Sequence, residues 1–273
     1  MTEFSNIESE VGMEKLLEKI DSQLDALAPI TLEEMSCIKL MNRIDKKYII
    51  RLDTLPLLLD MAKDDYYIQF TDGKRRFLYR SCYYDTDDAF YYNIHQNGRR
   101  VRQKIRVREY VYSNLTFLEI KNKNNKGRTS KVRIKVPEVD LNTNEEAQDY
   151  INKNSWFDFS QVKPRLQNQF FRVTLVNKAK TERLTIDMDI RFKSYLTGVE
   201  NNNPDMCIIE LKRDGNKPSP FLDYFSRLRI KAKGISKYCY GMMLTEMDLK
   251  RNRFKPKLRY IEKVTGFGGG IQQ

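Results

Sequence analysis

The stretch from Arg99 to Lys135 constrains the fold of this 273-residue chain more than any other part of the sequence. It carries thirteen lysine and arginine residues against two acidic ones, while the whole chain has a net charge of +12. In its first part the cations recur at every second position: Arg100, Arg102, Lys104, Arg106 and Arg108. Alternate side chains of a β-strand point to opposite faces, so these cations would form one row. Such a row cannot face an apolar core and requires water or a multiply charged anion.

Composition limits the class of protein. A hydrophobic content of 40% with 14 Phe and 16 Tyr is typical of a folded globular protein. The sequence has no apolar run of about 18 residues and a polar N-terminus, which predicts a soluble, cytoplasmic chain without a transmembrane segment. Four separated cysteines and one histidine leave little for a zinc site, a disulfide framework or a Ser-His-Asp triad. Any metal would have to bind carboxylates, which favours Mg²⁺ or Mn²⁺.

The sequence predicts helices and strands along one globular domain. Helical spacing and capping residues predict helices over residues 12–28, 31–41, 53–64, 144–152, 220–233 and 236–249. Strand patterns fall at 43–50, 66–70, 76–84, 100–110, 116–123, 129–136, 167–176, 183–192 and 206–212. We expect N-terminal helices in residues 1–42 that pack on a catalytic domain at 43–249, with the helix of 220–233 ending at Gly234. Residues 250–273 are basic and then Gly-rich, which predicts a disordered end or a linker.

Most of these strands have one ionic and one apolar face. The ionic positions are Glu119 and Lys121, then Lys131 and Arg133, then Arg183 and Asp187, and finally Glu210 and Lys212. Such a sheet could leave its ionic face in water, or it could close into a barrel with that face inside. Because the pattern recurs in so many strands, we expect an α+β fold: a closed antiparallel β-barrel of about eight strands, with a polar basic interior and flanking helices. A sheet that binds nucleic acid would interleave stacking aromatics, so no nucleic acid is expected.

Carboxylates stand among the inward cations. Glu119, Glu210, Asp187 and Asp189 would repel an anion in the bore, and a divalent cation between carboxylate and phosphate removes that conflict. The alternative is that Glu119 and Glu210 only form ion pairs with neighbouring lysines or arginines.

Seven motifs, taken together, resemble a known family. They are Arg43-x-Asp45-x-Lys47-Tyr48; Ser81-x-Tyr83-Tyr84-Asp85-Thr86; Tyr92-x-x-His95-x-x-Gly98-x-x-x-Arg102-x-Lys104-x-Arg106-x-Arg108-x-Tyr110; Phe117-Leu118-Glu119-x-Lys121; Arg183-x-Thr185-x-Asp187; Ile209-Glu210-x-Lys212; and Ser236-Lys237-Tyr238. In this order they resemble the VTC polyphosphate polymerase domain. That domain is a branch of the triphosphate tunnel metalloenzymes, which also include the CYTH triphosphatases. The resemblance covers about residues 43–243.

The resemblance implies roles for particular residues. Basic tunnel residues that hold phosphates are matched by Lys47, Arg106, Arg108, Lys121, Arg172, Arg183 and Lys237. Of these, Lys47, Arg106, Arg108 and Lys237 are the catalytic candidates. The same rows and motifs add Arg102, Lys104, Lys131, Arg133, Lys212 and Ser236 as phosphate-binding candidates. Glu210 matches the metal-binding carboxylate, with Glu119 and Asp187 as further ligands.

The implied activity is metal-dependent transfer of the γ-phosphate of ATP to a growing polyphosphate chain. The triphosphatase branch carries Glu-x-Glu-x-Lys where this chain has Arg43-x-Asp45-x-Lys47, which favours the polymerase branch. The alternatives are a triphosphate or polyphosphate hydrolase, and a domain that only binds polyphosphate or an inositol pyrophosphate. A membrane-protein partner for export would place the chain at a membrane surface.

Overall fold

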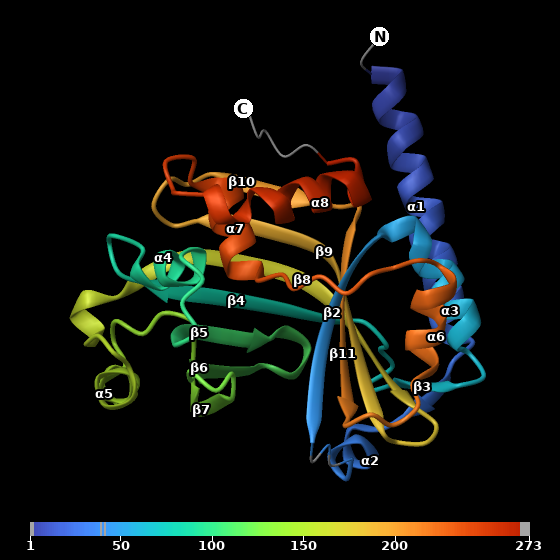
Figure 1. The fold of residues 1–273 in the computed structure, drawn as a ribbon, viewed down its shortest axis with the longest axis horizontal. Coiled ribbons are helices and arrows are strands. Elements are labelled where there is room, and N and C mark those ends of the chain that lie inside the picture. Colours follow the sequence, from blue (N-terminus) through green and yellow to red (C-terminus); the bar gives the residue numbers. More distant parts are fainter. Residues whose placement is uncertain (1–2, 39, 41, 268–273) are drawn as a thin grey trace. The chain divides into compact units, whose positions relative to one another are not determined.

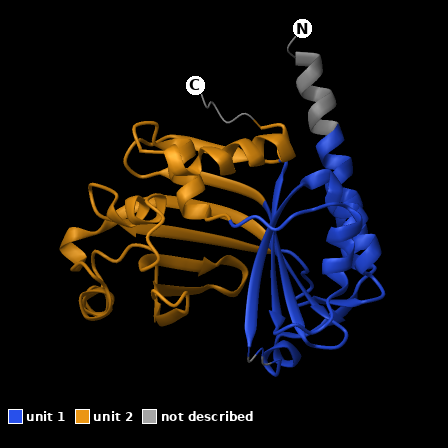
Figure 2. Ribbon diagram, in the orientation of Figure 1, with its two compact units in different colours: residues 1–76, 172–188, 205–234 blue, residues 77–171, 189–204, 235–273 orange. Residues whose placement is uncertain are grey.

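The computed structural model describes residues 3–38, 40 and 42–267. The protein is α+β, with helices and a large, mainly antiparallel sheet (Figure 1). It divides into two compact units, which are described one at a time (Figure 2). Unit 1 holds residues 1–76, 172–188 and 205–234, and unit 2 holds residues 77–171, 189–204 and 235–273. Among the described residues, no helix is long and apolar enough to span a membrane.

Unit 1 combines six strands with four α-helices. The helices are α1 (Glu3–Asp25), α2 (Leu32–Ser36), α3 (Leu55–Ala62, after the 3-10 turn Leu52–Thr54) and α6 (Pro220–Arg227). The strands are β1 (Ala28–Ile30), β2 (Arg43–Arg51), β3 (Tyr66–Gln69), β11 (Met206–Asp214) and the unit 1 parts of β8 (Lys163–Asn177) and β9 (Glu182–Ser194). They pair in the order β2-β11-β9-β8-β3-β1. Strand β11 is antiparallel to β2 and to β9, β3 is antiparallel to β8, and β1 is parallel to β3.

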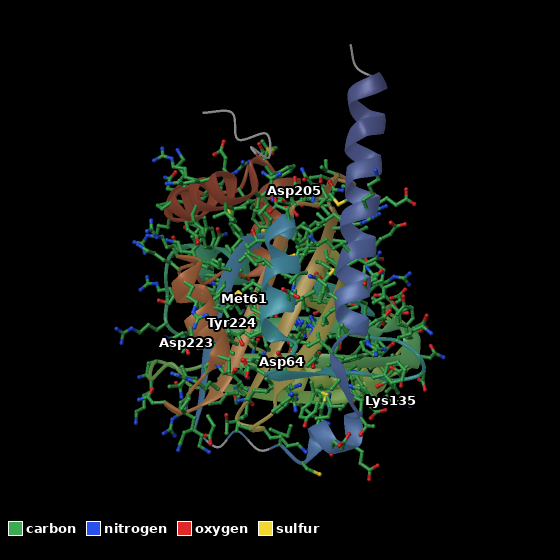
Figure 3. The ribbon with its side chains drawn as sticks, turned by 90° about the vertical axis from the view of Figure 1, so that its right-hand side faces the viewer. Met61, Asp64, Lys135, Asp205, Asp223 and Tyr224 are labelled. Carbon is green, nitrogen blue, oxygen red and sulfur yellow. The ribbon has the colours of Figure 1, made fainter. Side chains whose placement is uncertain are left out.

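Helices α3 and α6 pack against each other in unit 1. Figure 3 shows Met61 of α3 beside Tyr224 of α6, and the Tyr224 hydroxyl donates to the carboxylate of Asp65. On the sheet side, the ring of Phe225 stacks on Tyr48 of β2 with centroids 3.9 Å apart. These contacts fix β2, the strand that carries Lys47.

Unit 2 contains an antiparallel meander formed by β5 (Arg102–Tyr110), β6 (Leu115–Lys123) and β7 (Thr129–Val136). Its other strands are β4 (Phe77–Asp85), β10 (Glu200–Asn203) and the unit 2 parts of β8 and β9. The helices are α4 (Phe90–Gln96), α5 (Glu145–Asn154), α7 (Lys237–Thr245) and α8 (Lys255–Thr265), with 3-10 turns at Val111–Ser113, Phe159–Gln161 and Asn252–Phe254. The order is β10-β9-β8-β4-β5-β6-β7.

The apolar face of the meander forms the core of unit 2. Ile105, Val107, Leu118 and Ile120 are fully buried and share a hydrophobic cluster with Ile151 of α5. The alternation predicted from the sequence is therefore confirmed for β5 and β6. Burial of one face directs the row of cations to the opposite face.

The predicted closure of the barrel is not confirmed. Along the sheet the strands run β2-β11-β9-β8-β4-β5-β6-β7, and within the described residues no pairing joins β2 to β7. The sheet is therefore open. Alternation along a strand determines which face each side chain takes, but it does not determine whether the end strands pair.

Several helix boundaries differ from the prediction. The predicted capping box of Thr31 and Glu34 is present, but α2 ends at Ser36; Met41, the predicted end, lies outside the described residues. Helix α6 ends at Arg227 rather than at Gly234, because Arg229 adopts φ +55° and Ile230 N–H donates to the Phe225 carbonyl, which forms a Schellman-type end.

Two helices were not predicted. Residues 90–96 form α4, and residues 255–265 form α8 in the segment expected to be disordered. Leu258, Ile261 and Thr265 of α8 are buried on one face, and Gly266 (φ +73°) caps its end. The last glycines of the predicted tail, at 268–270, lie outside the described residues, and the domain boundaries stay a prediction.

Candidate active site

Cations from three strands gather on one face of unit 2. In the pairing register, Arg106 stands opposite Glu119, which stands opposite Arg133, and Lys104 and Lys131 flank Lys121 in the same way. Same-face positions of β5, β6 and β7 hold nine cations: Arg102, Lys104, Arg106, Arg108, Lys121, Lys123, Lys131, Arg133 and Lys135. Glu119 is the carboxylate among them. This face therefore carries a large excess of positive charge.

Glu119 is buried and fully engaged. Its side chain is 1% exposed. Arg106 Nε donates to Oε2 at 2.7 Å, and Lys131 Nζ donates to Oε1 at 3.0 Å. Burial opposes ionisation, but the charges of Arg106, Arg108 and Lys121 outweigh it and hold the pKa of Glu119 well below its usual range. Glu119 is thus an ionised carboxylate with both oxygens occupied.

Lys121 is disfavoured as a cation by its burial and by its basic neighbours. Burial and the neighbouring charge of Arg106 lower the pKa of Lys121 to about 6. A lysine whose positive charge is disfavoured near neutral pH marks a place where an anion would restore it.

Strand β4 adds two residues to this face that the sequence prediction left out of the site. Ser81 Oγ accepts from Arg108 Nε at 3.0 Å. Tyr83 is paired in register with Arg106, and although burial raises its pKa, the charges of Arg106, Arg108 and Lys104 outweigh burial and lower it. The signal was present in the sequence, because Ser81, Tyr83 and Asp85 alternate along one strand face.

The N-terminus of α7 brings Ser236 and Lys237 to the same cations. Ser236 caps α7, and its Oγ accepts from Lys104 Nζ at 2.9 Å. Lys237 Nζ lies 3.8 Å from the ring centroid of Phe170, and the Arg108 guanidinium lies 5.7 Å from the same centroid. The structure thus joins Lys104, Arg108, Ser236 and Lys237, which the sequence had placed in separate motifs.

Asp85 holds α7 in place. Its carboxylate accepts hydrogen bonds from the backbone N–H groups of Tyr91 and Tyr92 in α4 and from the hydroxyl of Tyr238 in α7. The backbone N–H of Thr86 is a further donor to the same carboxylate. Burial raises the pKa of Asp85, although all of these hydrogen bonds act to lower it. Asp85 is therefore a positioning residue that links α4 to α7.

The remaining predicted residues lie in unit 1. Glu210 is paired in register with Lys47, with 3.7 Å between Oε1 and Nζ, and its Oε2 accepts from Lys212 Nζ. Burial opposes ionisation of Glu210, but the charges of Lys47 and Lys212 outweigh burial and lower the pKa of Glu210 to about 2.

The two arginines of unit 1 have different partners. Arg172 forms a two-point pair with Asp187, with N–O distances of 2.6 and 2.7 Å. Arg183 Nη2 donates to the Met35 carbonyl of α2 at 2.7 Å, a backbone contact the sequence did not predict.

The three predicted metal ligands differ in how well they fit that role. Within the described part of the chain, no group of three or more His, Cys, Asp or Glu side chains could hold a metal ion. Both oxygens of Glu119 and both of Asp187 accept hydrogen bonds from cations. Glu210 is 22% exposed, and its Oε1 has a lysine only at 3.7 Å. Glu210 thus fits a Mg²⁺ or Mn²⁺ ion that takes most of its ligands from phosphates and water.

The fold and the site together define a class of α+β protein in which strands of a mainly antiparallel sheet carry rows of cations. The model of the VTC domain family matches residues 42–246, and the chain belongs to that family. This confirms the resemblance found in the sequence motifs.

Solved structures show a weak likeness. A conserved hypothetical protein from Pyrococcus furiosus is 12% identical with a TM-score of 0.40, covering 72% of this chain and 99% of its own. A putative adenylyl cyclase from Hippeastrum, described as having a dominant triphosphatase activity, is 13% identical with a TM-score of 0.47, covering 76% and 99%. Values this low carry no functional inference. A comparison with curated proteins finds no match.

Proposed function

We propose that this protein is a polyphosphate polymerase that transfers the γ-phosphate of ATP to a growing inorganic polyphosphate chain. The observation that carries the proposal is the excess of positive charge on the ionic face of unit 2, where cations of three paired strands surround Glu119. Membership of the VTC domain family supports a function related to polyphosphate. A chain of phosphates supplies negative charge along several strands at once, which a single carboxylate does not.

The proposed reaction requires positioning and charge neutralisation rather than a protein nucleophile. A terminal oxygen of the acceptor chain attacks the γ-phosphorus of ATP, the bond from that phosphorus to the β–γ bridging oxygen breaks, and ADP leaves with the electron pair. Arg106 and Arg108 would bind the equatorial oxygens, on which charge accumulates. Lys121 would gain a proton as the polyanion binds, because the added negative charge favours its ammonium form.

The acidic residues have different proposed roles. A Mn²⁺ or Mg²⁺ ion, when bound, would neutralise phosphate charge, and Glu210 is the residue that would hold it. Glu119 and Asp187 would keep Arg106 and Arg172 oriented through the ion pairs described above. Their assignment as metal ligands stays a prediction.

Hydrolysis is the second candidate function. The observation that favours it is the open sheet, because a tunnel that excludes water needs a closed wall. The closed bore, the membrane-protein partner for export and the cytoplasmic location remain predictions from the sequence.

Incubation of the purified protein with ATP and either metal tests the proposal. We expect long-chain polyphosphate on a gel, and we expect Lys47→Ala or Glu210→Gln to abolish its synthesis while thermal unfolding stays cooperative. Lys193→Ala is the matched control, because Lys193 forms an exposed pair with Glu200 and should retain full synthesis. Release of orthophosphate without polymer would establish the hydrolase instead, and synthesis by Glu210→Gln would remove Glu210 from the mechanism.

A further inference from the structure

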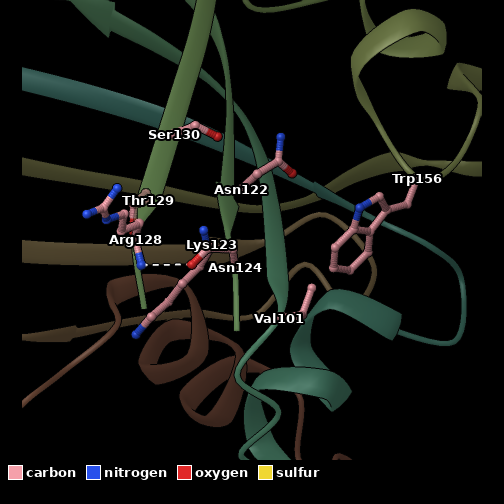
Figure 4. Close-up of a pocket in the computed structure, with 8 residues that line it drawn as sticks. All are labelled: Val101, Asn122, Lys123, Asn124, Arg128, Thr129, Ser130 and Trp156. Atoms are coloured by element: carbon pink, nitrogen blue, oxygen red, sulfur yellow. Dashed lines mark hydrogen bonds between the residues drawn. The ribbon is translucent and has the colours of Figure 1, made fainter. Parts of the chain in front are cut away.

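Unit 2 holds a cavity that the proposed reaction does not use. Its volume is about 470 Å³, within the range of small-molecule sites, and its lining combines an indole ring with amides, hydroxyls and cations (Figure 4). The lining residues are Val101, Asn122, Lys123, Asn124, Arg128, Thr129, Ser130 and Trp156. Figure 4 shows Trp156 on one side of the cavity and Arg128 with Thr129 on the other.

The cavity lies at the ends of β6 and β7, where residues of both strand faces line it. Asn122 lies between Lys121 and Lys123 on β6, and Ser130 directly precedes Lys131 on β7, so both take the face opposite to the cations. Asn122 and Ser130 are also paired in register. Lys123 and Thr129 have the parity of the ionic face and line the cavity from the other side, while Trp156 follows α5.

Trp156 is held rigidly but remains 44% exposed. Its indole packs against Phe90 and Tyr91, with ring centroids 6.4 and 6.0 Å away. Its backbone N–H donates to Gln103 Oε1 at 2.9 Å. Since the ring is fixed on one side and exposed on the cavity side, it offers a prepared surface for a planar ligand.

The lining offers two cations, Lys123 and Arg128, beside amide and hydroxyl groups that can donate hydrogen bonds. Gln103 Nε2 donates to Asn122 Oδ1 at 2.7 Å, which leaves the amide NH₂ of Asn122 to donate to a ligand. Arg128 is fixed at its backbone by Asn124 Oδ1 at 2.9 Å, the dashed line in Figure 4. Among the described residues, no carboxylate forms an ion pair with Lys123 or Arg128. The ligand that matches is planar, accepts hydrogen bonds and carries negative charge.

We propose that this cavity binds a purine nucleotide as a second, non-catalytic site. The base stacks on Trp156 and accepts a hydrogen bond from Asn122, while the phosphate pairs with Arg128 and Lys123. This inference goes beyond the proposed function, because it does not require that the ionic face transfers phosphate.

The chain itself supplies a reporter for this site, because Trp156 is its single tryptophan. Tryptophan fluorescence of the intact protein is titrated with AMP, with ATP and with tripolyphosphate, using free tryptophan amide to correct for absorption. We expect AMP and ATP to quench saturably and tripolyphosphate, which has no base to stack on the indole, not to quench.

Two variants in the same loop sharpen the test. Arg128→Ala should weaken AMP binding about tenfold at an unchanged maximal quench, since a charge-assisted hydrogen bond is lost. Lys126→Ala changes an exposed cation of that loop that does not line the cavity, and should bind as wild type. The absence of saturable quenching, or equal binding by Arg128→Ala, would overturn the site.

Polymer synthesis measured on the same samples separates the two proposals. Synthesis without quenching removes the second site and leaves the polymerase. Quenching by AMP in a protein that makes no polymer removes the polymerase and supports the site.

Discussion

At the scale of single residues, Glu119 is the buried carboxylate that pairs with cations of the ionic face. It is 1% exposed and lies between Arg106 and Lys131. We expect Glu119→Gln to lower the free energy of unfolding by about 3 kcal/mol, because removal of one partner leaves the other charges buried without compensation. Chemical denaturation measures this. Glu200→Gln, in an exposed pair with Lys193, is the control and should change stability by less than about 1 kcal/mol.

The response of Glu119→Gln to an anion gives a second measurement. If the cations are arranged for phosphates, tripolyphosphate should raise the unfolding temperature of this variant more than that of the wild type. A variant as stable as wild type without the anion would show that the face tolerates its charge and has no need of a bound polyanion.

The buried side chain of His95 should make the free energy of unfolding depend on pH. Burial and the charges of Lys104 and Arg102 lower its pKa to about 2, and Cys239 Sγ lies 3.0 Å from its Nδ1. The unfolded chain binds a proton at His95 near pH 6.5, whereas the folded chain does not. Stability is therefore present above pH 6.5 and is lost as pH falls through the window from 6.5 towards 2, by up to about 1.4 kcal/mol per pH unit.

Denaturation of wild type and His95→Gln at pH 7.5, 6.5 and 5.5 isolates this contribution. We expect the loss between pH 6.5 and 5.5 to be smaller in the variant by roughly 1 kcal/mol. Equal losses in both proteins would assign the acid sensitivity to other groups.

At the scale of elements, α7 depends on one glycine. A Cβ at Gly241 would lie 2.4 Å from Phe192 Cδ1 and 2.6 Å from Leu166 Cδ2, so α7 could not keep its present distance from β8 and β9. We expect Gly241→Ala to cost about 1–3 kcal/mol and to weaken binding of tripolyphosphate, because α7 carries Ser236 and Lys237.

Gly12→Ala is the matched control for Gly241→Ala. Gly12 lies in α1 with nothing within 4 Å of a Cβ, so alanine should raise stability by about 0.5–1 kcal/mol. Thermal denaturation compares the two. A neutral Gly241→Ala variant would mean that α7 has room to move.

The sequence predicted the strands and their faces well, because burial of Ile105 and Leu118 requires their neighbours to point away. It failed where structure depends on distant partners. Helix α8 exists because Leu258 and Ile261 find a core to cover them. This contact cannot be found from local periodicity.

The sequence predicted which residues share the ionic face, but it did not predict the contacts between residues of different motifs. Parity placed Arg106, Glu119 and Lys131 on one face, and the structure brings them into contact. The links from Lys104 to Ser236 and from Asp85 to Tyr238 join residues more than 130 positions apart in the chain, which one sequence does not reveal. The predicted closure of the sheet is not confirmed for the same reason, because pairing of the end strands depends on residues far apart in the chain.

At the scale of the whole molecule, the net charge of +12 makes stability depend on anions and on salt. Repulsion among the cations opposes folding, and a bound polyanion removes it. We expect tripolyphosphate at about 100 times its dissociation constant to stabilise the protein by about 2.7 kcal/mol. Because salt screens charge, a fixed concentration of tripolyphosphate should raise the unfolding temperature by less in 0.5 M than in 0.05 M NaCl.

Sulfate at equal ionic strength separates specific binding from general screening. It screens the cations as tripolyphosphate does, but it cannot contact several strands of the ionic face at once. We therefore expect a larger shift in unfolding temperature with tripolyphosphate, and we expect Arg106→Ala to remove most of the difference. Equal shifts with both anions would show that the face responds to charge alone, and the cations would then have no phosphate-binding arrangement.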